Sequence, residues 1–234
     1  MTVPVDQTSI QTAAAGPPED SFALPAHYRS FVGLVQRAAK RLLDVLAATL
    51  GLLILAPLFV VIGALLVADS GWPVFYPWRV VGRRGRYFTG YKFRTMVTNA
   101  GALQDALADR NEMSGPVFKM RDDPRVTRVG RVLRKYSIDE LPQLWSVVKG
   151  DMSLVGPRPP LQSEWVRFEP WQRRKLAVTP GITCLWQVQG RAEIRDFRRW
   201  ARLDIEYIER WNLTLDLVIL WKTLWAVLSR QGAY

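Results

Sequence analysis

The sequence predicts a helix-dominated α+β protein that is held in a membrane by a re-entrant helix and carries interfacial amphipathic helices. Three observations lead to this fold class. The segment from Val45 to Ala68 contains no charged residue, basic residues lie on both sides of it, and the rest of the chain alternates short apolar stretches with turns and amphipathic segments. Apolar residues make up 49% of the 234 residues, too many for a disordered chain.

The chain divides into three parts. Residues 1–33 are expected to form a flexible tail, because the stretch TAAAGPPED is rich in turn formers and the segment has no sustained periodicity. This tail also lacks the basic start and early apolar run of a signal peptide. Residues 34–70 are assigned to the membrane helix, and residues 71–234 to a domain on the cytoplasmic side.

The apolar segment from Val45 to Ala68 would form roughly 36 Å of helix, enough for a hydrocarbon core of about 30 Å. Pro57 lies at its middle, where a proline removes a backbone hydrogen bond, so we expect the membrane helix to break at Ala56-Pro57. The positive-inside rule draws both basic flanks to the cytoplasm. A re-entrant hairpin satisfies both constraints; the alternatives are a kinked but complete membrane span and, less well supported, a buried helix of a soluble protein. The flanking basic residues are Arg37, Lys40, Arg41, Arg79, Arg83, Arg84 and Arg86.

The C-terminal region contains two amphipathic or apolar segments. In the first, aromatic and apolar residues recur at helical spacing, with charged residues on the opposite face. The second, from Leu213 to Leu228, is mostly apolar but too short to span a membrane comfortably. We favour a pair of interfacial helices with tryptophans at the headgroup level, and packing of this face against the domain's own core is the alternative. The recurring residues are Phe197, Trp200, Leu203, Tyr207 and Trp211.

Charge and composition limit the chemistry. The formal net charge of +11 indicates an anionic partner, which can be nucleic acid, anionic lipid or a phosphorylated substrate. Nucleic acid does not account for the long apolar segment and is not an expected partner. The single histidine, His27, lies in the tail and Cys184 is the single cysteine, which argues against histidine-based catalytic triads, histidine-ligated zinc and disulfides. An enzyme of this composition would depend on carboxylates, arginines and lysines.

The segment from Lys135 to Pro160, KYSIDELPQLWSVVKGDMSLVGPRPP, carries the candidate chemistry. Ser137 and Glu140 fit a capping box, which places Asp139 and Glu140 in the first turn of a predicted helix. Acidic residues in a first turn are also common helix stabilisers, and this plain structural role is the alternative.

Two arginines flank this carboxylate pair. Arg134 lies just before the predicted helix, whose N-terminus can bind phosphate. Arg158 lies in a loop stiffened by three prolines, where a guanidinium can clamp a phosphoryl group with little loss of entropy. Together these features predict a phosphoryl-handling site at a membrane surface, with a divalent cation between the carboxylates and an anionic diphosphate.

These motifs resemble those of the bacterial sugar transferases, which are monotopic polyprenyl-phosphate phosphoglycosyl transferases. The resemblance covers about residues 34–230 and rests on YKFRTM, SIDELPQLW with KGDMSLVGPRP, PGIT with WQV and Gly190-Arg191, and LDLVILWKT. It implies a monotopic protein of the bacterial inner membrane whose catalytic domain, residues 71–234, faces the cytoplasm.

The resemblance also implies an activity: transfer of a sugar 1-phosphate, which we expect to be a hexose, from a UDP-sugar to undecaprenyl phosphate, with release of UMP. Asp139 would be the nucleophile that forms a covalent phosphosugar-aspartate, Glu140 would assist the second half-reaction, and both would hold Mg²⁺ or Mn²⁺. The substrate phosphate-binding residues that the same motifs imply are Arg134, Arg158, Arg191, Gly190, Lys92 and Arg94.

The implied role is the first membrane step of exopolysaccharide or O-antigen synthesis. The expected partners are the UDP-sugar, undecaprenyl phosphate and membrane lipid, and a homodimer is left open. The alternative is a catalytically inactive scaffold of a polysaccharide assembly complex at the membrane surface.

Overall fold

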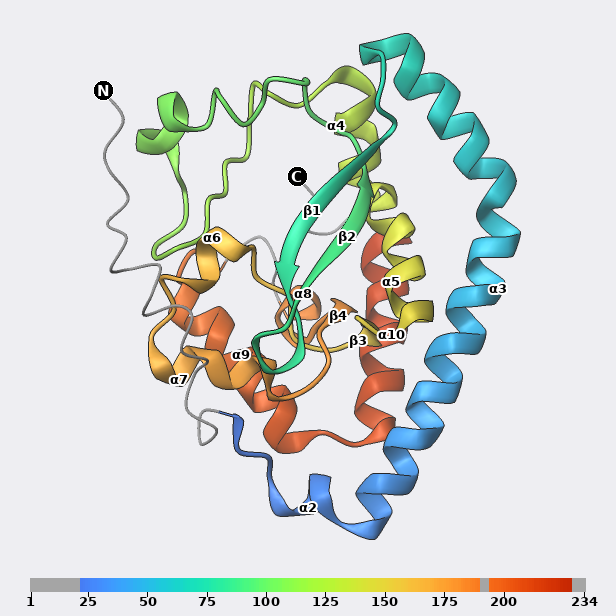
Figure 1. The fold of residues 1–234 in the computed structure, drawn as a ribbon, viewed down its shortest axis with the longest axis vertical. Coiled ribbons are helices and arrows are strands. Elements are labelled where there is room, and N and C mark those ends of the chain that lie inside the picture. The colour runs from blue at the N-terminus through green and yellow to red at the C-terminus, as the bar shows by residue number, and fades with distance from the viewer. Residues whose placement is uncertain (1–21, 190–193, 229–234) are drawn as a thin grey trace.

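The computed structural model describes residues 22–189 and 194–228, so the expected tail over residues 1–21 lies outside the described part of the chain. The described residues form a helix-dominated α+β fold, in which one long helix lies along one side of a domain of short helices and strands (Figure 1). The expected helix-dominated α+β class is therefore confirmed.

The described elements are mostly short. The α-helices are α2 (Ala26–Arg29), α3 (Phe31–Ser70), α4 (Arg128–Lys135), α5 (Leu144–Lys149), α6 (Gln162–Trp165), α7 (Pro170–Arg173), α8 (Leu185–Val188), α9 (Phe197–Arg210) and α10 (Leu213–Leu228). The 3₁₀ helices are η2 (Arg83–Gly85), η3 (Asp105–Arg110), η4 (Ile138–Gln143) and η5 (Arg174–Ala177). The strands are β1 (Phe75–Val81), β2 (Tyr87–Phe93), β3 (Ser153–Val155) and β4 (Gly181–Thr183).

The strands pair as two small sheets. β1 and β2 form an antiparallel hairpin in which Trp78 lies opposite Gly90. β3 and β4 pair in parallel, and this pairing brings the GPRPP and PGIT loops together. Gly156 donates its N–H to the carbonyl of Thr183 at 3.0 Å, and Gly181 donates to that of Pro157 at 3.0 Å. A Cβ on Gly181 would overlap the Gly156 nitrogen, so this close approach requires glycine.

The long helix α3 continues through Pro57 as one helix. Figure 1 shows its two halves inclined to each other around one side of the domain. The expected interruption of the helix at Ala56-Pro57 is therefore wrong in this form. A proline removes one backbone hydrogen bond, while the bonds of the neighbouring turns remain, so the helix bends without ending.

One face of α3 packs against the domain and the other is uncovered. Asp44, Ala48, Ile62 and Leu66 are buried at helical spacing. Only 11% of the most apolar window is buried, and by length and composition the helix can cross a membrane. A core helix of a soluble protein would be mostly buried. The exposed apolar residues of the outer face are Leu42, Leu43, Leu46, Leu50, Leu53, Ile54, Leu58, Val60, Val61 and Leu65.

Ordered packing begins earlier in the chain than expected. Phe22 and Tyr28 are buried, and α2 precedes the start of α3 at Phe31. The Tyr28 ring lies 4.8 Å from that of Trp211, centroid to centroid. The expected tail boundary at residue 33 is therefore too late, because these aromatic side chains bury apolar area against the C-terminal helices.

The aromatic stripe of α9 lies in the main core. Phe197, Trp200, Tyr207 and Trp211 are all buried there, and the rings of Trp200 and Trp186 stack with centroids 4.1 Å apart. The expectation that α9 is an interfacial helix is thus wrong, and packing against the domain's own core is the correct alternative. α10 differs, since it leaves an apolar face exposed: Leu217, Val218, Trp221, Leu224 and Trp225.

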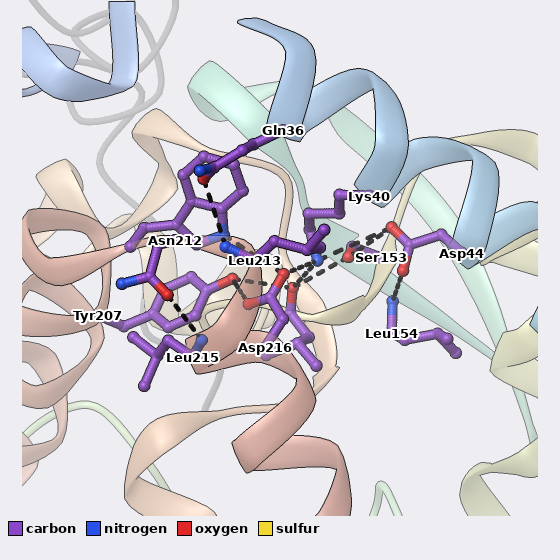
Figure 2. Close-up of polar contacts among 12 residues, drawn as sticks. Gln36, Lys40, Asp44, Ser153, Leu154, Tyr207, Asn212, Leu213, Leu215 and Asp216 are labelled. Atoms are coloured by element: carbon purple, nitrogen blue, oxygen red, sulfur yellow. Dashed lines mark hydrogen bonds and ion pairs between the residues drawn. The ribbon is translucent and has the colours of Figure 1, made fainter. Parts of the chain in front are cut away.

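A buried polar network fixes the first half of α3 to the domain (Figure 2). Lys40 Nζ lies 2.7 Å from Asp216 Oδ2 of α10 and donates to the carbonyl of Val155 at 3.0 Å. Tyr207 of α9 donates its hydroxyl to Asp216 Oδ1 at 2.7 Å. Asp44 accepts from the hydroxyl of Ser153 at 2.7 Å. α3, β3, α9 and α10 therefore meet at one point.

Candidate active site

The two candidate catalytic carboxylates lie on η4, directly after α4. Ser137 has a left-handed backbone conformation, with φ of 53°, and reverses the chain between these helices. Asp139 and Glu140 follow in the first turn of η4, both half-buried. The Ser137 side chain makes no cap hydrogen bond, so the expected capping box is wrong. The left-handed turn and Pro142 favour a tight 3₁₀ turn here over an α-helical start.

Glu140 lies between two cations from different parts of the chain. Its Oε1 atom is 2.7 Å from Lys92 Nζ on β2 and 3.7 Å from an Arg158 guanidinium nitrogen. Lys92 Nζ lies 4.3 Å from the ring centroid of buried Trp78. Trp78 can cross the hairpin because Gly90 has no side chain there.

Arg134 lies at the C-terminal end of α4, half-buried, and its Nε donates to Thr95 Oγ1 at 2.9 Å. Burial lowers the pKa of Arg134, while the charge of Asp139 acts in the opposite direction. Arg134 is therefore an arginine within electrostatic reach of the candidate nucleophile.

Arg158 combines charge with access to solvent. About one third of its side chain is exposed, at 34%. Burial acts to lower the pKa of Arg158, but the carboxylates of Glu140 and Glu164 outweigh it and raise that pKa. The guanidinium therefore stays charged and still presents donors to a ligand.

The structure thus brings Asp139, Glu140, Lys92, Arg134 and Arg158 together, as the motifs imply. Five charged groups from β2, α4, η4 and the GPRPP loop converge there, two negative and three positive. Such an arrangement can hold an anionic diphosphate next to a carboxylate, because the cations offset the repulsion between the two.

Arg94 does not belong to this group, and its expected phosphate-binding role is corrected. The side chain is 5% exposed and its guanidinium donates to the carbonyls of Ser70 and Gly71 at the end of α3 and of Pro73. Helix ends leave backbone carbonyls without helical partners, and Arg94 supplies donors to them. Gly190 and Arg191 lie outside the described residues.

Two supporting residues were missed by the sequence analysis. Trp78 lies beneath Lys92, and Thr95 holds Arg134. Thr95 belongs to the YKFRTM motif, in which the charged residues give the stronger functional signal. Trp78 gives no comparable signal, because its role depends on the hairpin register that places it opposite Gly90.

Protein ligands alone do not form a metal centre here. Among the residues that the structure describes, no three or more His, Cys, Asp or Glu side chains are gathered for a metal ion. Asp139 and Glu140 are the candidate ligands, as two adjacent carboxylates.

The described residues thus combine a long, mostly exposed apolar helix with a domain in which a carboxylate pair is bounded by arginine and lysine. Residues 35–230 match the family described as bacterial sugar transferase, and the chain belongs to that family.

Curated relatives share this region. Galactosyl transferase CpsE of Streptococcus agalactiae is 45% identical over 195 residues, covering 83% of this chain and 43% of the relative. Exopolysaccharide production protein ExoY of Rhizobium meliloti is 42% identical over 200 residues, which cover 84% of this chain and 88% of the relative. Undecaprenyl-phosphate galactose phosphotransferase of Salmonella typhimurium is 43% identical over 203 residues, which cover 85% of this chain and 42% of the relative. The chain therefore spans less than half the length of CpsE and the Salmonella protein, but most of ExoY.

Proposed function

We propose that this protein transfers a sugar 1-phosphate, with a hexose as the expected sugar, from a UDP-sugar to undecaprenyl phosphate and releases UMP. The observation that carries the proposal is Glu140 held between Lys92 and Arg158, next to Asp139. Relatives named as an undecaprenyl-phosphate galactose phosphotransferase and a UDP-galactose-lipid carrier transferase support it. Exopolysaccharide or O-antigen synthesis is the proposed pathway class, supported by the ExoY relative.

In the first half-reaction, an Asp139 carboxylate oxygen attacks the sugar-proximal phosphorus of the UDP-sugar. The bond from that phosphorus to the bridging oxygen breaks, and UMP leaves with the electron pair. A carboxylate is already ionised at neutral pH, so the attack needs no general base. Arg134 and Arg158 bind the charged phosphoryl oxygens in this proposal and orient them for attack.

In the second half-reaction, a phosphate oxygen of undecaprenyl phosphate attacks the phosphorus of the covalent phosphosugar-aspartate. The acyl phosphate bond breaks and the Asp139 carboxylate is regenerated. Lys92 holds Glu140 in place at 2.7 Å, next to the Asp139 carboxylate that the acceptor displaces. In this proposal Glu140 assists the second half-reaction and would be a ligand of the divalent cation.

The donor set fits Mg²⁺ or Mn²⁺. Mg²⁺ usually binds through one or two protein carboxylates together with substrate phosphates and water, and Asp139 and Glu140 supply such a pair. When bound, the metal would neutralise negative charge on the diphosphate. Lys92, Arg134 and Arg158 supply the remaining positive charge from the protein.

We further propose that α3 is a re-entrant membrane helix that bends at Pro57, that α10 lies at the interface, and that residues 71–234 form a catalytic domain on the cytoplasmic face of the bacterial inner membrane. Both ends of α3 contact this domain. Lys40 near the start forms an ion pair with Asp216, and the backbone carbonyl of Ser70 at the end accepts a hydrogen bond from Arg94. A helix with both ends on one domain favours entry and exit on the same side of the bilayer. The apolar outer face of α3 supports contact with lipid.

The test of the activity is release of UMP by purified protein from a panel of UDP-sugars with undecaprenyl phosphate and Mg²⁺. Asp139→Asn should abolish release, whereas Asp151→Asn, which alters a surface ion pair with Lys149, should leave it near the wild-type rate. Trapping with UDP-sugar alone should give a mass increase of one sugar phosphate on the peptide that contains Asp139. No UMP from any UDP-sugar, or full turnover by Asp139→Asn, would contradict the proposal and leave the scaffold alternative.

The membrane placement is tested by labelling with a membrane-impermeant thiol reagent. Cys184 is buried, so a Cys184→Ala background allows single cysteines to be introduced at Arg29 and Trp72, which are exposed next to the two ends of α3. In right-side-out vesicles neither introduced cysteine should react with the reagent before lysis. In inverted vesicles both cysteines should react. A helix that crosses the membrane would give opposite results for the two positions.

A further inference from the structure

Trp78 and Gly90 form an uneven pair at the centre of the β1–β2 hairpin. They lie opposite each other in the register, and a Cβ on Gly90 would overlap the indole nitrogen of Trp78. The indole therefore occupies the space that a side chain at position 90 would fill. Only glycine leaves this space free for the ring.

The ring of Trp78 reaches Lys92, two residues further along β2. Side chains alternate between the two faces of a strand, so Lys92 is the next residue on the face of Gly90 and a diagonal neighbour of Trp78. The Lys92 ammonium lies over the indole, with Nζ 4.3 Å from the ring centroid, and 2.7 Å from Glu140 Oε1. One ammonium group is thus shared between an aromatic face and the carboxylate next to the candidate nucleophile.

The indole is not the simplest way to fill this position. Trp78 is 5% exposed, and its Nε1 atom is buried without a hydrogen-bond partner among the described residues. Burying an N–H group without a partner is unfavourable, and a phenylalanine or leucine would avoid it. Among the aromatic side chains, however, tryptophan offers a cation the most favourable ring face. Contact with Lys92 is therefore what the indole provides and a smaller apolar residue would not.

A lysine needs such support to keep one orientation. Its side chain is long and flexible, so fixing it costs conformational entropy. Lys92 keeps 16% of its side chain exposed, and water therefore competes with Glu140 for the ammonium. An aromatic face against the side chain favours the orientation in which Lys92 contacts Glu140.

We propose that Trp78 is a positioning residue for Lys92: its ring, seated on Gly90, holds the ammonium against Glu140. The proposal deepens the proposed function, since it rests on Lys92 acting through Glu140 in the transfer of the sugar phosphate. Trp78 is buried and contacts no substrate in this proposal. Its effect on the reaction therefore passes through Lys92.

The first test measures the position of Lys92 without any substrate. In NMR spectra of the full-length protein, isotope-labelled at the lysine ε-carbons, the ring current of the indole should move the Lys92 signal upfield. Loss of this signal in Lys92→Met assigns it. In Trp78→Leu the signal should return to the range of the other lysines. An unshifted Lys92 signal in the wild type would overturn the proposal before any variant is compared.

The matched control removes an aromatic ring from the other face of the same hairpin. Tyr87 lies five residues before Lys92 on β2, so the two side chains point to opposite faces. Tyr87 is also exposed. Tyr87→Leu should therefore leave the Lys92 signal in place and change kcat for UMP release less than about twofold. A signal that moves as far in Tyr87→Leu as in Trp78→Leu would overturn the assignment to Trp78.

The kinetic test compares two replacements at position 78. Trp78→Leu should lower kcat for UMP release about tenfold, as expected for the loss of a desolvated cation–π contact. Trp78→Phe keeps a ring and should retain at least about one third of the wild-type kcat. In a Lys92→Met background, Trp78→Leu should change the rate less than about twofold, because the positioned group is gone. Equal losses in the Phe and Leu variants, or a full-size Trp78→Leu effect without Lys92, would overturn the proposal.

A compensating variant separates positioning from folding. Gly90→Ala should lower the thermal midpoint, because the added Cβ overlaps the indole. Combining it with Trp78→Leu removes the ring, so the double variant should unfold at a higher temperature than Gly90→Ala. Its kcat should nevertheless stay at the level of Trp78→Leu, because no ring supports Lys92. Recovery of kcat to the wild-type value together with the midpoint would show a purely structural role and overturn the proposal.

The two proposals fail in different ways. If the wild type releases no UMP from any UDP-sugar, the proposed function fails, and the position of the Lys92 signal in the wild type and in Trp78→Leu still decides whether Trp78 positions this lysine.

Discussion

Lys92 Nζ lies 2.7 Å from Glu140 Oε1 and thereby ties the β1–β2 hairpin to the turn that carries both candidate catalytic carboxylates. Lys92→Met should remove this link, whereas the Arg158 guanidinium at 3.7 Å from Glu140 Oε1 would remain. We expect UMP release to fall by about a hundredfold, an effect typical of losing a preorganised charged group at a reacting centre. Lys149→Met, which breaks an exposed lysine–aspartate pair of the same 2.7 Å length, should change the rate less than twofold. Similar rates for the two variants would contradict the role of Lys92.

Arg94 and Arg158 should respond differently to replacement by lysine. Arg94 is buried and donates to several backbone carbonyls at the end of α3, a pattern that a single ammonium cannot reproduce. Arg94→Lys should lower the free energy of unfolding by about 2 kcal/mol and leave KM for the UDP-sugar unchanged per folded molecule. Arg158→Lys should raise KM and leave thermal stability nearly unchanged. Denaturation curves and steady-state kinetics on both variants check this, and the reverse pattern would restore Arg94 as a substrate-binding residue.

Gly181→Ala should strongly destabilise the protein. The added Cβ would overlap the backbone nitrogen of Gly156 in the paired strand, and backbone cannot move aside as a flexible side chain can. We expect a loss of more than about 2 kcal/mol in unfolding free energy together with loss of UMP release. Gly101→Ala is the control, because no atom lies within 4 Å of its Cβ position. A well-folded, active Gly181→Ala protein would show that β3 and β4 are not held this closely.

The Asp123–Arg125 pair should contribute stability that depends on pH. Asp123 Oδ2 lies 2.7 Å from an Arg125 guanidinium nitrogen, and both residues are buried. Burial acts to raise the pKa of Asp123, but hydrogen bonds and charge from Arg125 outweigh it and lower that pKa. Because the folded-state pKa is below the unfolded one, the stabilisation is fully present above the unfolded value, about 3.8, and is lost as the pH falls through the folded value.

Asp123→Asn should therefore unfold more easily than the wild type at pH 7, by about 1–3 kcal/mol, and the difference should shrink below about pH 4. Thermal or denaturant unfolding in one detergent at several pH values measures it. Asp151→Asn, at a partly exposed pair, should show little difference at any pH. A deficit for Asp123→Asn that is constant down to pH 3 would contradict the assignment.

The sequence predicts the parts of the fold that depend on local pattern. The uncharged segment around Pro57, the helix-dominated class and the motif residues near Asp139 are all recognisable from residue type and spacing. The structure brings Lys92, Arg134 and Arg158 to the same place. Long-range packing is what local pattern does not contain: the stripe from Phe197 to Trp211 suits a membrane interface and a protein core equally well, and the core is its position here.

The errors in the site have a similar cause. Arg94 lies two residues after Lys92 in one motif, a spacing that would place both side chains on the same face of a continuous strand. However, β2 ends at Phe93, so Arg94 lies outside the strand. Lys92 therefore faces the site, whereas Arg94 enters the end of α3. Motif membership cannot separate these two roles, because both residues are basic.

Val155 is the last residue of β3 and directly precedes the loop that carries Arg158, and its carbonyl accepts a hydrogen bond from Lys40 of α3 at 3.0 Å. One hydrogen bond thus links the helix that we propose to enter the lipid to the residue that precedes the loop that we propose to bind the diphosphate. The height of the carboxylate pair above the bilayer would then be built into the protein, as the depth of α3 sets it. A lipid-linked phosphate, confined to the headgroup layer, would meet these carboxylates at a constant level in bilayers of different thickness.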